Sequence, residues 1–178
     1  MLAEPRQSRI VLLNLARGSA EGVAERFAVR CGGSLALLPI SHEILGAKSI
    51  AFGEYLTDRL PVGVAASIEH FKSDALLPWR DPGFAAHLAE ADVGILFLGG
   101  AYLEEDVLIA ALEGARRGYE MRLLSDLAFA RTETDRQLVV NRLAQHGIVT
   151  TTVRQALFEW AVVLDDPAMT VRILQLLS

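Results

Sequence analysis

A short apolar run that passes through a glycine pair into a helical pattern restricts the fold of this chain more than any other feature. Residues Val93–Leu98 are mostly apolar, two glycines follow them, and Leu103–Arg117 has the apolar spacing of a helix. A buried strand that turns tightly into a helix is the first half of a unit whose next strand is parallel. The segment therefore predicts an α/β protein built on a parallel sheet.

The start of this predicted helix carries three carboxylates and neither Cys nor Ser. Glu104, Glu105 and Asp106 follow directly after Leu103. A helix N-terminus stabilises negative charge, so a thiol there would gain acidity and an oxyanion site together. Carboxylates at the same place favour the helix electrostatically, by about 0.3–1 kcal/mol each. The position is typical of an active site, but its residues supply no ordinary nucleophile.

The same alternation of strands and helices runs through the whole chain. Residues 41–80 are the exception, where a helix-like Ile50–Leu60 precedes Pro61 and residues 62–70. Alternation predicts a three-layer, Rossmann-like sandwich with a mainly parallel sheet covered on both faces, and a single domain over residues 1–178. We expect strands at Arg9–Leu15, Ser34–Ile40, Val93–Leu98, Glu120–Ser125 and Ile148–Thr152, and helices at Ala20–Cys31, Pro82–Ala91, Leu103–Arg117, Thr132–His146, Val153–Leu164 and Pro167–Leu177.

Composition excludes several classes of protein. Hydrophobic residues make up 52% of the 178 residues, which predicts a large buried core. A net charge of −5 gives no basic surface for nucleic acid. No apolar run reaches the roughly 18 residues of a membrane helix, and the N-terminus lacks the form of a signal peptide. The one cysteine, Cys31, is expected to be a buried structural thiol, so we expect a cytoplasmic protein without nucleic-acid or membrane partners.

Ligands of open parallel sheets bind beyond the carboxyl ends of the strands. The polar residues expected there are Asn14, the segment after Ile40, the turn Gly99–Asp106, and Asp126, which could equally cap the next turn. His42 follows one predicted strand, but the chain lacks the closely spaced Asp and His residues of a metal site. We therefore expect no metal and no cofactor.

Three stretches taken together resemble the isochorismatase-like (cysteine hydrolase) superfamily, most closely its isochorismatase domain-containing subgroup. The first is Gly100–Val107, followed by Gly118-Tyr119 and Ser125–Ala128; the others are Arg131–Gly147 and Ile148–Leu177. The resemblance covers nearly the whole chain. It implies an isochorismatase-like fold and a pocket for a small amide, imide or related molecule at the carboxyl ends of the strands.

The resemblance also implies where three catalytic residues would stand. In the family an Asp after the first strand is the base, a Lys assists, and a Cys at the helix start forms a covalent intermediate. Here Asn14 stands at the Asp position, Lys72 near the Lys position and Asp106 at the Cys position, with His70 as the alternative to Lys72. Asn cannot accept a proton at neutral pH, although it can hydrogen-bond a ligand. The usual cysteine hydrolase chemistry is therefore predicted to be absent.

The resemblance implies substrate contacts as well. Gly100, Ala101 and Tyr102 form the loop before the helix, and Trp79 stands roughly where the family carries a pocket aromatic, although core packing of Trp79 is equally expected. Members that hydrolyse vinyl ethers also lack the Cys and have a Tyr where Tyr102 stands. Their mechanism uses the Asp after the first strand as the acid, and this chain has Asn14 at that position instead.

Two functions remain open from the sequence. One is an altered hydrolase, with Asp106 and Lys72 as its polar centre and Asn14 positioning the substrate. The other is a catalytically inactive member that acts as a binding or assembly protein. The apolar segment Met169–Leu177 needs a covering surface, either on its own domain or on a second copy, and we expect a homo-oligomer.

Overall fold

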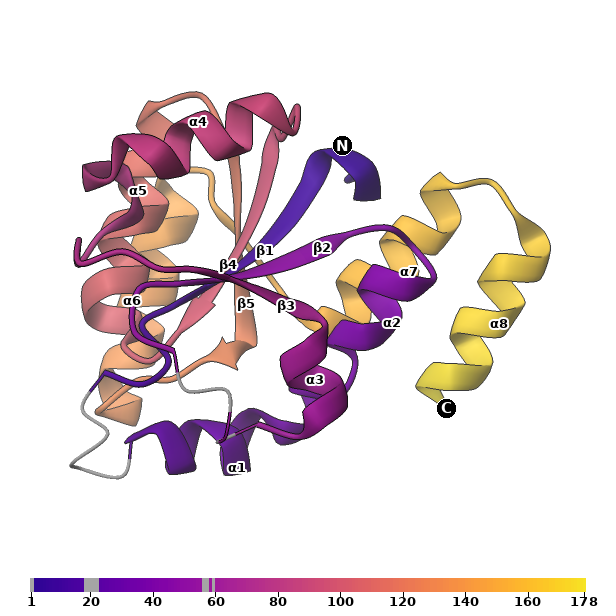
Figure 1. The fold of residues 1–178 in the computed structure, drawn as a ribbon, viewed down its shortest axis with the longest axis horizontal. Coiled ribbons are helices and arrows are strands. Elements are labelled where there is room, and N and C mark those ends of the chain that lie inside the picture. Colours follow the sequence, from indigo (N-terminus) through magenta and orange to yellow (C-terminus); the bar gives the residue numbers. More distant parts are fainter. Residues whose placement is uncertain (1, 18–22, 56–57, 59) are drawn as a thin grey trace.

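The centre of the molecule is a six-stranded parallel sheet of strand order β3-β2-β1-β4-β5-β6 (Figure 1). The structure is a computed structural model that describes residues 2–17, 23–55, 58 and 60–178. Its strands are β1 (Ser8–Leu13), β2 (Lys48–Phe52), β3 (Ile68–Phe71), β4 (Ile95–Gly100), β5 (Glu120–Ala128) and β6 (Val149–Thr151).

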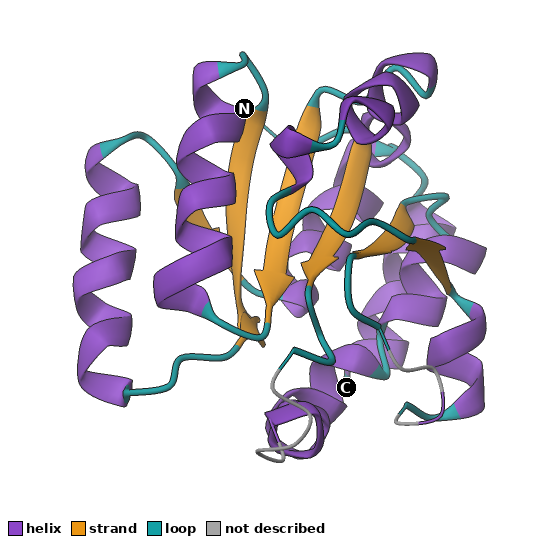
Figure 2. Cartoon of the chain, turned by 60° about the vertical axis from the view of Figure 1, so that its left-hand side comes forward, coloured by secondary structure: helices purple, strands orange, loops and turns teal. Residues whose placement is uncertain are grey.

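Helices connect the strands and cover both faces of the sheet, as Figure 2 shows. They are α1 (Val23–Leu35), α2 (Leu38–Glu43), α3 (Val62–Ala66), α4 (Pro82–Glu90), α5 (Leu108–Arg116), α6 (Glu133–Gln145), α7 (Val153–Val163) and α8 (Pro167–Leu177). Short 3-10 turns lie at η1 (Pro5–Gln7) and η4 (Pro78–Arg80), and a π-helical turn, η5 (Leu103–Val107), precedes α5. The expected three-layer α/β fold is confirmed.

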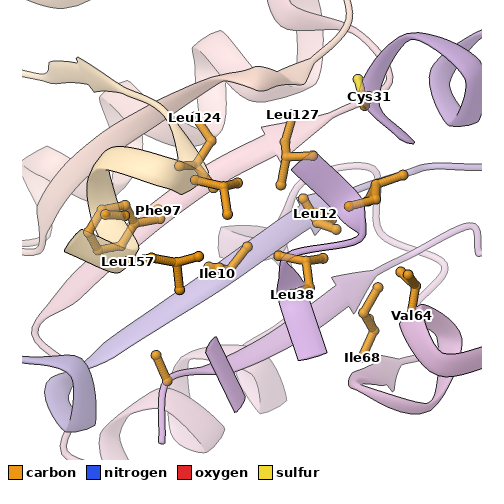
Figure 3. Close-up of a cluster of buried hydrophobic side chains, with 14 of the residues drawn as sticks. Ile10, Leu12, Cys31, Leu38, Val64, Ile68, Phe97, Leu124, Leu127 and Leu157 are labelled. Carbon is orange, nitrogen blue, oxygen red and sulfur yellow. The ribbon is translucent and has the colours of Figure 1, made fainter. Parts of the chain in front are cut away.

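The sheet divides the apolar core in two, because successive side chains of a strand point to opposite faces. Ile10 and Leu12 of β1 pack with Phe97 and with Leu157 of α7 in one cluster (Figure 3). The alternate β1 residues, Val11 and Leu13, pack in the other cluster with α4, α5 and α6. Helices α1, α2, α3 and α7 cover the first face, and α8 packs against α7. A strand that is buried on both faces has a continuous apolar sequence, which is why β1 was predictable.

The predicted strand Ser34–Ile40 is wrong, because these residues form the end of α1 and the start of α2. The helix expected to end at Cys31 continues to Leu35, so Gly32 and Gly33 lie inside α1, and a Cβ at either would meet no atom within 4 Å. Pro39 occupies the first turn of α2, where its missing N–H costs nothing. A short apolar run does not distinguish a buried helix from a buried strand.

The helix-like reading of Ile50–Leu60 is also wrong at its start, where Ile50–Phe52 belong to β2. Residues 56, 57 and 59 of that segment, and residues 20–22 of the predicted helix Ala20–Cys31, lie outside the described residues. The edge strand β3 was missed within residues 62–70. Only four residues long and exposed at two of them, β3 has no clear apolar pattern of its own.

The order of the strands places a topological switch point between β1 and β4 at the carboxyl edge of the sheet. From β1 the sheet continues through β2 on one side and through β4 on the other, and connections that leave neighbouring strands in opposite directions open a ligand site between them. Leu13 is in register with Gly100, so the residues after β1 and after β4 lie at the same level. No helix among the described residues is long and apolar enough to cross a bilayer.

Candidate functional site at the carboxyl edge of the sheet

Asn14 directly follows β1 in a conformation that few residues adopt. Its φ is 49°, a left-handed value that Asn tolerates better than most side chains, and its backbone N–H donates to Phe52 O at 2.9 Å. Gly53 lies against its side chain with φ 79°, and a Cβ there would come within 2.2 Å of Asn14 Oδ1. Glycine at position 53 therefore makes room for the buried Asn14 amide.

Asp106 belongs to the π-helical turn η5, which begins the helix that follows β4. The backbone N–H of Val107 bonds Tyr102 O at 3.3 Å, which widens the first turn by one residue. Gly100 permits the tight approach of this segment to β1, since a Cβ on it would lie 2.6 Å from Leu13 O. The carboxylate of Asp106 is thereby carried toward the end of β1 and is 1% exposed.

The two side chains meet in a hydrogen-bonded pair. Asn14 Nδ2 donates to Asp106 Oδ2 at 2.7 Å and to Leu76 O at 3.0 Å. Asn14 Oδ1 accepts from the backbone N–H of Glu54 at 3.4 Å. The amide of Asn14 therefore has partners for both its hydrogens and for its oxygen, all from the protein itself.

Arg17, which was not expected as a site residue, binds the other oxygen of Asp106. Residues 14–17 form a turn, in which the backbone N–H of Arg17 donates to Asn14 O at 3.0 Å. This turn brings the Arg17 side chain to the Asp106 carboxylate. Arg17 Nη1 donates to Asp106 Oδ1 and also lies 3.2 Å from Glu105 Oε2. Burial alone lowers the pKa of Arg17, but the hydrogen bond to Asp106 and the two carboxylate charges raise it overall. Arg17 therefore stays charged as the counterion of Asp106.

A second arginine completes an ion-pair cluster around the Tyr102 ring. The guanidinium carbon of Arg131 lies 4.2 Å from the ring centre and that of Arg17 lies 5.2 Å from it. Arg131 Nε is 3.2 Å from Glu105 Oε1, and Glu104 Oε1 accepts from the backbone N–H of Arg131 at 3.0 Å. Two arginines therefore offset two of the three carboxylate charges at the helix start, and Tyr102 is buried under them.

Lys72 and His70 do not join this pair; they line a neighbouring cavity of about 320 Å³. No hydrogen bond or ion pair links Lys72 to Asn14 or Asp106 among the described residues. His70 Nε2 lies 2.9 Å from Gly53 O, and a carbonyl only accepts, so this nitrogen carries the hydrogen. The full lining is Ala16, Gly53, Glu54, Tyr55, His70, Lys72, Ser73 and Asp74. Gly53 thus separates the cavity from the buried Asn14 amide.

The remaining predicted contacts lie around this centre. Ala101 is buried, and its N–H donates to Leu13 O at 3.1 Å. Trp79 packs beneath α5, where its indole N–H donates to Ala110 O at 2.7 Å and its ring stacks on Tyr119 at 5.2 Å. Its role in substrate binding, like those of Gly100, Ala101 and Tyr102, stays a prediction.

The other residues with reactive or ligating groups have structural partners or lie elsewhere. Asp126 accepts from Ser34 Oγ at 2.7 Å and from the first N–H of α7, Val153 N, at 3.1 Å, so it caps that helix. Burial raises the pKa of the Cys31 thiol to about 11. His42 lies in α2, before β2 and not after it. Among the described residues, no three His, Cys, Asp or Glu side chains are grouped as metal ligands.

The chain is similar in sequence and in fold to known proteins. No family model matches the chain. Over 133 residues it is 25% identical to isochorismatase domain-containing protein 1 of Salmo salar, a match that covers 69% of this chain and 47% of that protein. The chain thus spans about half the length of this curated relative.

Solved structures share the fold over nearly the whole chain. A ribonuclease from Caenorhabditis elegans has a TM-score of 0.76 at 18% identity and covers 99% of this chain and 92% of its own. A cysteine hydrolase from Pseudomonas syringae has 0.74 at 10%, covering 90% and 95%. The YcaC gene product of Escherichia coli, an octameric hydrolase of unknown specificity, has 0.73 at 15%, covering 97% and 89%. The expected resemblance to the isochorismatase-like (cysteine hydrolase) superfamily is confirmed.

Proposed function

We propose that this protein of the isochorismatase-like superfamily binds a small amide or imide at the carboxyl edge of its sheet without cysteine hydrolase chemistry. The single observation that carries the proposal is the pairing of Asp106, whose two carboxylate oxygens are bonded to Arg17 and Asn14. A carboxylate nucleophile must present a free oxygen to an electrophile. Asp106 presents none, since it is also buried.

The neighbouring side chains support the same conclusion. Asn14 has no proton-accepting group at neutral pH, and its amide is fully bonded within the protein. Cys31 is buried and its pKa is raised to about 11, so very little thiolate exists at pH 7. Neither the base nor the nucleophile of the family is therefore available from the residues at these positions.

The cavity beside Asn14 offers the groups that an amide requires. Its volume of about 320 Å³ is at the lower end of the range of small-molecule pockets. Lys72 supplies N–H donors for a carbonyl oxygen, while the Glu54 carboxylate accepts from an amide N–H. The Tyr55 hydroxyl is buried and has no partner among the described residues, so a polar ligand would satisfy it.

Ligand-observed NMR with benzamide and succinimide as probes tests the binding proposal. We expect saturable binding to the wild-type protein, and about tenfold weaker binding to Lys72→Met. Lys48→Met is the matched control, because Lys48 is an exposed lysine at the opposite end of β2. Equal affinities of the wild type and Lys72→Met, or no saturable binding of either probe, would contradict the proposal.

Assays of ammonia release from benzamide and of ring opening of succinimide to succinamic acid separate this proposal from an altered hydrolase. If the protein only binds these molecules, neither product should form faster than in buffer. The hydrogen bond between Asn14 and Asp106 at the switch point between β1 and β4 is the observation that favours the altered hydrolase. Hydrolysis of either probe that disappears in a folded Asp106→Asn variant would establish Asp106 as a catalytic residue. It would overturn the proposal that the protein binds amides without hydrolysing them.

Self-association is part of the same proposal. Val171, Leu174 and Leu176 of α8 are large apolar side chains at least 46% exposed. Apolar surface of this kind favours a covering partner, and the Escherichia coli structural neighbour is octameric. Light scattering after size exclusion would show a homo-oligomer, and Leu174→Glu would shift it to the monomer. The cytoplasmic location and the single domain over residues 1–178 stay predictions.

A further inference from the structure

We propose that the protein has a second ligand site, for a hydroxylated phosphate monoester, at the C-terminal end of α5. A cavity of about 380 Å³ lies there, lined by Arg80, Glu113, Arg116 and Arg117. Helix α5 starts at the carboxyl edge of the sheet and ends just before β5, so this cavity lies toward the amino edge, away from Asn14. It is independent of the amide site.

Two of its guanidinium groups are held in place by the protein. The Arg117 guanidinium lies over the Trp79 ring, 5.5 Å from its centre, and Nη2 donates to Trp79 O at 3.3 Å. Trp79 is itself fixed by Ala110 and Tyr119. Arg80 Nη2 donates to Glu113 Oε1 at 3.0 Å. Side chains that are already ordered lose less conformational entropy when a ligand binds.

Most of the hydrogen-bonding capacity of these arginines is unused. A guanidinium has five N–H donors, and the bonds above use one donor of Arg80 and one of Arg117. The side chain of Arg116 has no partner among the described residues. Three positive charges face one carboxylate in a chain whose net charge is −5. The cavity is therefore a local anion site on an acidic protein.

Glu113 determines which anion fits. Its Oε1 accepts from Arg80, but Oε2 is buried and has no hydrogen-bond partner among the described residues. A ligand that fits the whole cavity must bring acceptors for the arginines and a donor for Glu113 Oε2. A phosphate monoester offers three acceptor oxygens that match guanidinium groups, and a hydroxyl beside the phosphate supplies the donor. The volume exceeds that of a phosphate ion, which leaves room for such a group.

Isothermal titration with ribose 5-phosphate and inorganic phosphate tests this site at low ionic strength. We expect one saturable site for ribose 5-phosphate, weakened about tenfold in Arg116→Gln. Arg116 carries the test because Arg117 also packs on Trp79, so its removal could disturb the fold. Arg154→Gln, at an exposed arginine of α7, is the matched control and should bind as the wild type does. Lys72→Met should also leave this affinity unchanged.

Glu113→Gln separates a built site from general attraction of anions. Removing the carboxylate should strengthen binding of inorganic phosphate, because the repulsion is lost. Binding of ribose 5-phosphate should improve less than that of inorganic phosphate, because its hydroxyl loses a charged acceptor. Three results would overturn the proposal: no saturable binding of ribose 5-phosphate, equal weakening by Arg116→Gln and Arg154→Gln, or binding of an oligoglutamate peptide in place of both phosphates.

Discussion

Two neighbouring regions at the carboxyl edge of the sheet differ in how their polar groups are satisfied. The Asn14–Asp106 pair is buried and bonded within the protein, and the partly exposed Arg17 binds the second oxygen of Asp106. The adjacent cavity keeps an exposed Lys72 and a buried Tyr55 hydroxyl that lacks a partner among the described residues. The location of a polar group at this edge therefore does not by itself make the group reactive. A charge that is paired within the protein stabilises the structure, whereas a polar group without a partner remains available to a ligand.

The largest effect should come from removing the charge at the centre of the buried pair. Asp106→Ala leaves the Asn14 amide without one acceptor and Arg17 without its buried counterion. Breaking such a pair should lower the free energy of unfolding by about 3 kcal/mol, measured by urea denaturation. Asp74→Ala, at an exposed Asp that lines the cavity, should change it by less than about 0.5 kcal/mol. Equal losses from the two substitutions would contradict the conclusion that the buried pair stabilises the protein more than the cavity residues do.

A smaller loss is expected at the residue that separates the two regions. Gly53→Ala would place a methyl group 2.2 Å from Asn14 Oδ1 at a φ of 79°, so the Asn14 amide must move. We expect a loss of about 2 kcal/mol in the free energy of unfolding. Gly63→Ala is the control, because Gly63 lies in α3 with open space around it, and alanine there should be neutral or stabilising. An unchanged stability of Gly53→Ala would mean that the pair tolerates displacement.

The buried thiol of Cys31 lies in neither region, and we expect it to make the protein less stable at alkaline pH. Burial raises the pKa of Cys31 from 9.0 to about 11, so the unfolded chain releases this proton first. The stabilisation by the buried neutral thiol is complete below pH 9 and is lost as the pH rises toward 11. The difference in unfolding free energy between wild type and Cys31→Ala should therefore shrink by up to about 2 kcal/mol over that window. A constant difference would show that Cys31 titrates normally.

The smallest effect should be found at the rim of the buried pair. Arg131→Gln removes a partly exposed ion pair with Glu105 and a cation–π contact with Tyr102. Such contacts are worth about 0.5–1 kcal/mol, and salt screens the ion pair. Thermal unfolding at low and at high salt should show the loss decrease as salt is added. A loss of stability as large as that of Asp106→Ala would mean that Arg131 contributes to stability as much as the buried pair does.

The sequence predicts best the elements whose apolar residues form one continuous run or recur with a helical period. The strand β1 and the helices from α4 to α8 were all expected close to their observed bounds. Residues 34–71 were misread, because the apolar residues of α2 and β2 face a core on one or both sides and have no distinct period. The β3 strand is recognisable only beside β2, with which it pairs.

The candidate site shows the same division. Asn14 and Asp106 were expected at one edge of the sheet, and they lie within hydrogen-bond distance. Arg17 was not expected, although a basic residue three positions after Asn14, opposite an acidic helix start, was a readable signal. Lys72 was grouped with the pair by resemblance, and the structure places it in the adjacent cavity.

The sequence by itself determined the alternation of strands and helices, the parallel sheet and the absence of a cysteine at the helix start, because local periodicity and residue identity are properties of short segments. Only the tertiary structure decided which groups are satisfied. Arg17 lies 89 positions from Asp106 in the chain, and Asn14 lies 92 positions from it. Partners that far apart meet through the strand order of the sheet, and their hydrogen bonds, which no local pattern encodes, set the difference between a buried ion pair and an available site.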